Sequence, residues 1–344
     1  MNYEGEYVMA KENAKENVRA TQILKEKFGD KVELPSEVDC VLENNDCIIR
    51  LNPQKVQVKN MQEDANAFEA WAVALYIALG KSGKITLDVN GSFKQMGYEQ
   101  TGGHWSRFLY RALRFSEQYK WFKLGGEVET EVKKFKEYLE NNSFTNNLPE
   151  GEAGIKGAHN DENVVEATFA EYTEFREKIG GNPVSRQLPV GLFRITDESE
   201  KGKLYKYTKD KKVFTGGKSA IDLWSWREDE FEVIELKTKN IMAGIITEIF
   251  FYTNYMYDFL VGNPETFRLN RYNNESKNDC RGYKNISGNE FRKVRGIMLA
   301  DKYHPILNSD EVLKVLNKNG DVGIKYVQAK YEFNIDINIK RCEV

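Results

Sequence analysis

The sequence has few of the residues that bind zinc or form disulfide bonds. Its 344 residues include three histidines and four cysteines, and the cysteines stand apart from one another at Cys40, Cys47, Cys280 and Cys342. No pair of them has the Cys-x-x-Cys spacing of common zinc sites, which argues against a zinc-binding module. Scattered cysteines are typical of a reducing compartment, and we expect a cytoplasmic protein.

A long apolar run and a strong net charge are also missing. The run from Ala70 to Leu79 is too short to cross a bilayer, and the first six residues are acidic where a signal peptide would be basic. We therefore expect no membrane role. The 50 Lys and Arg residues nearly balance the 53 Asp and Glu residues, so the formal net charge is -3. A nucleic-acid-binding surface would therefore have to be a local basic patch. The sequence does not determine whether the protein forms a homo-oligomer.

An Asn- and Gly-rich stretch divides the chain. Residues 141–157 contain few apolar side chains, which predicts a linker. A chain of 344 residues is long enough for two domains. We predict an N-terminal α+β domain at residues 1–140, whose role is unknown and for which nucleic-acid binding is one option, and a second domain at residues 158–344. Within the first domain, residues 56–58 are predicted to form a short strand.

Residues 218–239 have the most informative pattern in the second domain. Side chains of different kinds alternate over Ile221–Trp226, and a charged turn follows. The turn leads into Val233–Lys237, where Glu235 and Lys237 alternate with apolar residues. This pattern predicts a β-hairpin. Because successive side chains of a strand point to opposite faces, Glu235 and Lys237 should share one face, with apolar neighbours on the other.

The polar residues of this hairpin suit a metal site. Asp222 and Glu235 would repel each other unless a cation lay between them, and hard oxygen ligands are what Mg²⁺ prefers. Lys237, on the same face, would add a positive charge for a phosphate or its attacking water. The sequence therefore predicts a site for Mg²⁺, or Mn²⁺, held by Asp222 and Glu235.

The same residues carry a family resemblance. Ile221-Asp222 followed by Ile234-Glu235-Leu236-Lys237 resembles the motif of the PD-(D/E)xK, or restriction-endonuclease-like, nuclease superfamily, although the proline of the family name is absent. The resemblance implies that Asp222 and Glu235 hold the metal and that Lys237 assists the attacking water. It also implies a fold class: α/β, with a restriction-endonuclease-like αβββαβ core at about residues 160–335, preceded by the smaller α+β domain.

The helices around this hairpin offer further acids. In the resembling superfamily a Glu from the helix before the first strand often completes the metal site, and the predicted helix at residues 161–179 offers Glu166 and Glu171. Spacing does not decide between them, and the alternative is that both face solvent. On the helix after the hairpin, Glu248 and Tyr252 lie on one side. Some exonuclease-like members carry Gln and Tyr at this spacing, so the role of Glu248 stays open.

Two basic segments are candidates for nucleic-acid contact. On the predicted helix at residues 104–119, Arg107, Arg111 and Arg114 line up opposite an apolar face and are expected to contact phosphates; the alternative is a solvated basic face. A later segment combines basic and aromatic side chains, which suits phosphate contact and base stacking. Its candidate residues are Arg268, Arg271 and Lys277.

The predicted function is that of a metal-dependent nuclease. We expect an Mg²⁺-dependent phosphodiesterase, a deoxyribonuclease that acts in genome defence or DNA processing, with Asp222, Glu235 and Lys237 at its centre. The alternative is a nucleic-acid-binding or assembly module with a nuclease-like fold that does not cut. A third hypothesis is a nuclease that cuts RNA, since these residues do not distinguish RNA from DNA as the substrate.

Overall fold

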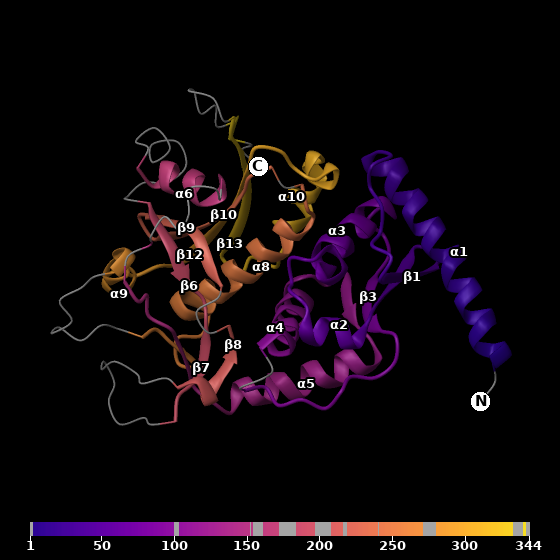
Figure 1. Ribbon diagram of the computed structural model, residues 1–344, viewed down its shortest axis with the longest axis horizontal. Helices are drawn as coiled ribbons and strands as arrows, with labels where there is room; N and C mark the ends of the chain where they lie inside the picture. Colours follow the sequence, from indigo (N-terminus) through magenta and orange to yellow (C-terminus); the bar gives the residue numbers. More distant parts are fainter. Residues whose placement is uncertain are drawn as a thin grey trace.

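The computed structural model describes residues 3–99, 103–151, 153, 161–171, 184–196, 208–215, 219–239, 241–270, 280–332 and 340–341. Side chains are described from residue 15 onward, except at residues 161, 340 and 341. Over these ranges the protein has a mixed α/β fold with three mixed β-sheets (Figure 1). The predicted α/β class is confirmed. The restriction-endonuclease-like core stays a prediction.

The first sheet belongs to the N-terminal part of the chain. Its strands, in spatial order, are β1 (Val38–Glu43), β2 (Asp46–Leu51), β3 (Ile85–Val89) and β4 (Phe122–Leu124). The helices of this part are α1 (Tyr3–Phe28), α2 (Pro53–Val58), α3 (Phe68–Ala78), α4 (Gly103–Gln118) and α5 (Gly126–Glu140).

Helix α2 corrects the prediction of a strand at residues 56–58. The side chain of Asn52 accepts hydrogen bonds from the backbone N–H groups of Gln54 and Lys55, and Pro53 occupies the first helical turn. An Asn cap followed by Pro favours a helix start over a strand. The local signal was therefore present, but three residues were too few to show the helical period.

The second sheet contains the predicted hairpin. Its spatial order is β14 (Lys340–Arg341), β13 (Ile324–Lys330), β12 (Lys293–Ala300), β10 (Glu230–Lys237), β9 (Ala220–Arg227) and β6 (Ser185–Pro189). Strands β9 and β10 pair antiparallel, whereas β10 pairs with β12 and β12 with β13 in parallel. The predicted hairpin is confirmed, and Pro189 lies on an edge strand, where a missing N–H costs no ladder bond.

Two helices cover this sheet on opposite faces. Helix α6 (Asp161–Glu171) packs on β6, β9 and β10, above an apolar cluster that includes Ile234 and Leu236. Helix α8 (Gly244–Tyr257) packs on β10 and β12. The short helices α9 (Lys284–Gly288) and α10 (Asp310–Leu316) follow α8 in the chain.

A third, smaller sheet corrects part of the predicted linker. Its order is β11 (Phe267–Arg268), β5 (Phe144–Asn146), β7 (Leu192–Arg194) and β8 (Lys212–Phe214). Strand β5 lies inside residues 141–157, and its three residues are buried. Asn-rich sequence favours turns, but here neighbouring strands from distant parts of the chain satisfy its backbone groups. Residues 144–146 therefore belong to a β-sheet and not to a linker.

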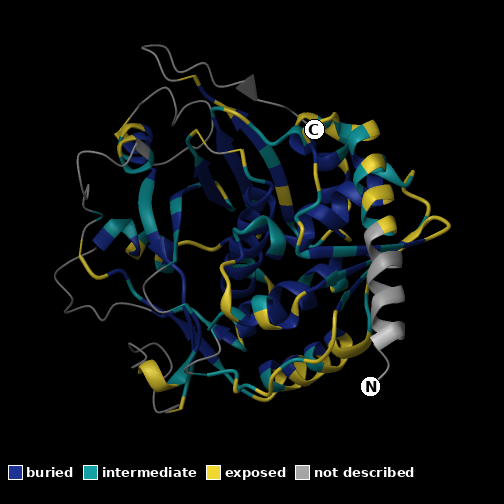
Figure 2. Cartoon of the chain, turned by 45° about the vertical axis from the view of Figure 1, so that its right-hand side comes forward, coloured by how far each residue is buried: buried dark blue, intermediate teal, exposed yellow. Residues whose placement is uncertain are grey.

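Helix α8 lies at the centre of the molecule. Besides the second sheet it contacts α3 and α4 of the N-terminal part, and almost every residue along it is buried. One cluster of buried apolar side chains extends from Ala20 to Tyr326, across both predicted domains. Figure 2 shows the buried residues in the interior, while exposed ones line the outer helices. The two halves of the chain thus pack on a common core.

The arginine ridge predicted on α4 is not an exposed surface. Arg107 and Arg111 are 4% and 2% exposed. Arg114 is bound by Asp258 of the C-terminal half, with 2.8 Å between NH2 and Oδ2. The prediction of an exposed basic face is wrong because α4 has a second packing surface, against α8 and β8, which helical period alone does not reveal.

The remaining predicted basic residues have different outcomes. Arg268 lies on β11 and donates a hydrogen bond from Nε to the carbonyl oxygen of Glu265. Arg271 and Lys277 lie outside the described residues. Their predicted contacts with nucleic acid stay predictions.

The described residues show neither a disulfide nor a helix suited to a bilayer. Cys40, Cys47 and Cys280 are free and buried, and Cys342 lies outside the described ranges. Over those same ranges, none of the helices combines the length and the apolar character that crossing a membrane requires.

A buried ion pair of Arg111 fastens α4 to α3 and α8. Its Nε and NH2 lie 2.7 and 2.6 Å from the two carboxylate oxygens of Glu69, and Thr247 donates a hydrogen bond to the same carboxylate at 2.9 Å. Both charged side chains are almost fully buried. The pair therefore links three helices at one point.

We expect Arg111→Met to lower the free energy of unfolding by about 3 to 5 kcal/mol, because it leaves the buried Glu69 carboxylate without its cation. Urea unfolding measures the change. The control is Lys133→Met, which removes an exposed ion pair with Glu129 and should cost under about 1 kcal/mol. Equal, small losses in both variants would contradict a structural role for Arg111.

Candidate metal centre

The two strands of the hairpin bring Asp222 next to Glu235. The paired register of β9 and β10 ends at Leu223 and Ile234. Just beyond it, the backbone N–H of Leu236 donates to Oδ2 of Asp222 at 2.9 Å. The Asp222 carboxylate thus binds the neighbouring strand directly and is held beside the carboxylate that follows Ile234.

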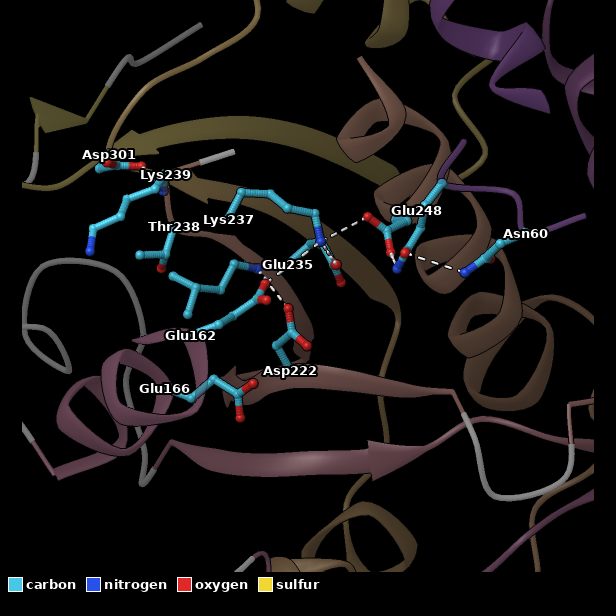
Figure 3. A network of polar contacts seen from close by, with 12 residues as sticks. Asn60, Glu162, Glu166, Asp222, Glu235, Lys237, Thr238, Lys239, Glu248 and Asp301 are labelled. Atoms are coloured by element: carbon cyan, nitrogen blue, oxygen red, sulfur yellow. Dashed lines mark hydrogen bonds and ion pairs between the residues drawn. The ribbon is translucent and has the colours of Figure 1, made fainter. Parts of the chain in front are cut away.

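The predicted division of β10 into two faces is confirmed. Ile234 and Leu236 belong to the apolar cluster under α6, whereas Glu235 and Lys237 line a pocket between the sheet and α8. The pocket has a volume of about 280 Å³. Its acidic residues come from α6, β9, β10 and α8 (Figure 3). They are Glu162, Glu166, Asp222, Glu235 and Glu248.

Lys237 is the one cation among the described residues that line this pocket. Its Nζ lies 2.7 Å from Oε1 of Glu235, 2.9 Å from Oε2 of Glu248 and 3.9 Å from Oε1 of Glu162. The side chain is only 11% exposed. One ammonium group therefore faces carboxylates from three elements.

The structure distinguishes the two candidate acids on α6. Glu166 is buried and lines the pocket, and its carboxylate accepts hydrogen bonds from Gln187 at 2.9 and 2.7 Å. Glu171 is exposed and does not line it. The structure therefore brings Glu166, and not Glu171, to Asp222 and Glu235.

Several residues of the pocket are not among those predicted from the sequence. Glu162 lies four residues before Glu166, a helical spacing that could have identified it. Gln187, on β6, and Asn60 and Gln62, from the N-terminal half, also line the pocket. No sequence signal marks these amides, because they reach the pocket only through tertiary packing.

The crowding of carboxylates changes their proton affinity. Burial, opposed by the charge of Lys237 and reinforced by that of Glu166, raises the pKa of Asp222 to about 8. Burial and the charge of Asp222 raise the pKa of Glu235 well above its usual value. Although burial works in the other direction, the charges of Glu235 and Glu248 raise the pKa of Lys237. Lys237 therefore stays positively charged while Asp222 and Glu235 hold protons more tightly.

These residues suit a hard divalent cation. Oε2 of Glu235 is buried and has no hydrogen-bond partner, so it is available as a ligand. Carboxylates with nearby amides are the donor set that Mg²⁺ and Mn²⁺ prefer. Within the described ranges, however, no three acidic, His or Cys side chains already form a coordination shell. The chemistry fits a metal ion, which Oε2 of Glu235 could bind while Oε1 stays in contact with Lys237.

Comparison of the chain with protein-family models, with curated proteins and with solved structures finds no match. The assignment of this pocket therefore depends on its own residues.

The raised pKa of Asp222 predicts how the metal-free protein responds to pH. In an unfolded chain the carboxyl ionises near its usual pKa of 3.8, whereas in the fold it holds its proton up to about pH 8. The fold therefore binds more protons than the unfolded chain over this range, and its stability falls as the pH rises. Asp222 should lower the unfolding free energy by about 1.4 kcal/mol per pH unit, which is up to about 3 kcal/mol between pH 5 and pH 7. In EDTA, Asp222→Asn should remove this part of the loss.

Urea unfolding at the two pH values tests this expectation. Glu171→Gln removes an exposed carboxylate from outside the pocket and should leave the pH dependence of the parent unchanged. An Asp222→Asn variant with the same pH dependence as the parent would show that Asp222 is not the carboxyl group whose pKa is raised in the fold.

Proposed function

We propose that this protein is a divalent-metal-dependent nuclease that hydrolyses phosphodiester bonds of DNA. The observation that carries the proposal is the convergence of Asp222, Glu235 and Lys237 in one pocket, joined there by Glu166 from the preceding helix. Two adjacent carboxylates and a lysine on a common strand face are the parts that metal-assisted phosphoryl chemistry requires.

The order of elements around the pocket supports the same proposal. Along the described chain, α6 precedes β6, β9 and β10, and α8 then precedes β12, although β7 and β8 of another sheet lie between β6 and β9. This is the helix, three strands, helix and strand of the predicted core. We therefore propose a PD-(D/E)xK type of nuclease, with β7 and β8 as an insertion.

Each polar residue of the pocket has a distinct part in this proposal. Asp222 and Glu235 would hold Mg²⁺ or Mn²⁺, which when bound supplies a Lewis acid that neutralises phosphate charge and lowers the pKa of a water molecule. Lys237 would donate hydrogen bonds to a phosphate oxygen as negative charge develops on it. Glu166, held by Gln187, fixes the acidic wall nearest α6.

The charge of the pocket explains why metal is needed before any phosphate enters. Five carboxylates line it, and they are opposed by Lys237 in the pocket and by Arg186, which lies 3.4 Å from Oε2 of Glu166. Even with some of these acids protonated, the pocket disfavours a phosphate group, because like charges repel strongly where water is scarce. Removal of divalent cations should therefore abolish both cutting and the approach of phosphate to Lys237.

A cleavage assay tests the activity. The parent protein should cut plasmid, linear duplex or single-stranded DNA with Mg²⁺ or Mn²⁺ and should cut none of them with EDTA, and RNA tests the choice of substrate. Calorimetry should show Mn²⁺ binding that Asp222→Ala abolishes. Binding of DNA without cutting under any of these conditions would favour the non-cutting module, and unchanged Mn²⁺ binding by Asp222→Ala would remove the site assignment.

Lys237→Ala separates chemistry from binding. Because its charge acts mainly on the transition state, we expect the variant to cut about a hundredfold to a thousandfold more slowly, with an affinity for DNA within a few-fold of the parent. Single-turnover cleavage over a range of enzyme concentrations gives the maximal rate and the half-saturating concentration separately.

The matched control is Lys239→Ala, since the side chain of Lys239 is exposed and does not line the pocket. It should cut at nearly the parental rate. If the parent cuts and Lys237→Ala cuts equally fast, the role given to Lys237 is wrong.

A further inference from the structure

A segment of the N-terminal half is fastened to the first turn of α8. A Cβ atom on Gly244 would lie 2.3 Å from the carbonyl oxygen of Gln62, so the close approach of the two backbones requires glycine at that position. Burial raises the pKa of the Asp64 carboxyl, and the backbone N–H groups of Ala243 and Gly244 beside it act in the opposite direction. This segment therefore lies against the start of α8 at the backbone of Gln62 and at the side chain of Asp64.

This attachment places the Gln62 side chain in the pocket. Its Nε2 donates a hydrogen bond to Oε1 of Glu248, and its Oε1 accepts one from Asn60 at 3.3 Å. The other oxygen of Glu248 lies 2.9 Å from Nζ of Lys237. A chain of polar contacts thus runs from Asn60 through Gln62 and Glu248 to Lys237. Figure 3 labels Asn60, Glu248 and Lys237 along this chain.

Lys237 has two close carboxylate partners, and one of them is also a proposed metal ligand. Nζ contacts Oε1 of Glu235, which is a proposed metal ligand, and Oε2 of Glu248. Because a cation bound to Glu235 would neutralise part of its charge, Glu248 becomes the near carboxylate that holds the ammonium most strongly. Glu248 can do so only if its own orientation is fixed, and Gln62 donates to its second oxygen.

We propose that Gln62 is a positioning residue of the proposed nuclease, which orients Glu248 and through it the ammonium group of Lys237. The inference rests on the proposed function for its effect on rate. It also means that the N-terminal half completes the catalytic pocket and is not only a separate binding module.

The amide side chain suits this position for a chemical reason. It donates to Glu248 and accepts from Asn60 at the same time, without adding charge. A lysine at position 62 would pair with Glu248 and compete with Lys237 for it. A methionine would keep most of the volume and remove both hydrogen bonds.

The test compares Gln62→Met and Gln62→Lys with Gln57→Met. Gln57 is also buried in the N-terminal half, but it bonds to the backbone of Lys94 and does not line the pocket. In single-turnover cleavage with Mn²⁺, both Gln62 variants should lower the maximal rate about tenfold to a hundredfold, with a half-saturating concentration within about threefold of the parent. Gln57→Met should change neither value.

A double variant tests whether the effect passes through Lys237. In a Lys237→Ala background, Gln62→Met should cause no further loss of rate, because the group that it positions is already gone. A loss as large as in the parent background would overturn the proposal.

A readout without catalysis keeps this test separate from that of the nuclease activity. In the metal-free protein the ¹⁵N signal of the Lys237 ammonium, assigned by its loss in Lys237→Arg, should exchange its protons with water faster in Gln62→Met than in Gln57→Met. If the parent does not cut nucleic acid, the nuclease proposal fails and this exchange rate still decides the positioning role. Equal exchange rates in the two variants would overturn it.

Discussion

The crowding of five carboxylates around a single ammonium group is the constraint on which the rest of the structure depends. Glu162, Glu166, Asp222, Glu235 and Glu248 line one pocket with Lys237, and most of these side chains are withdrawn from water. Such a cluster strains the fold unless protons or cations neutralise it. The raised pKa of Asp222 and the buried, unpartnered oxygen of Glu235 are two signs of the same strain. In the proposed nuclease, a divalent cation bound by Asp222 and Glu235 would relieve this strain.

Close backbone packing holds the acidic elements together against this repulsion. Helix α8 approaches β12 so closely that a Cβ atom on Gly296 would lie 2.6 Å from the Thr253 side chain, and Gly244 permits the same closeness to residues 60–64. On the other side of α8, the buried pair of Arg111 and Glu69 ties it to the N-terminal helices. The common core of the two halves is therefore part of what positions Glu248. A nuclease site built in this way would not separate cleanly from the N-terminal half.

The arginines of α4 show what the helical period of a sequence does not predict, namely whether a polar face is exposed or buried. The helical spacing of Arg107, Arg111 and Arg114 correctly places them on one side of the helix, opposite Trp105 and its apolar neighbours. Both sides of α4 are buried because of the elements that pack against it. Arg111 pairs with Glu69, 42 residues away along the chain, and Arg114 pairs with Asp258, 144 residues away. A basic stripe on a helix is compatible with solvent, with nucleic acid or with buried acids. Only the tertiary structure distinguishes these environments.

The alternation of side chains along β9 and β10 was enough to predict the hairpin, the shared face of Glu235 and Lys237, and the proximity of Asp222, because strand geometry is local. The α/β class was predicted from the resemblance that this hairpin carries, and the structure confirms the class. The choice of Glu166 over Glu171, the presence of Glu162, and the arrival of Gln62 at Glu248 were decided by how helices and loops pack on the sheet. These contacts join residues up to 186 positions apart. Local sequence determines which side of an element a residue occupies, whereas packing between elements determines what that side meets.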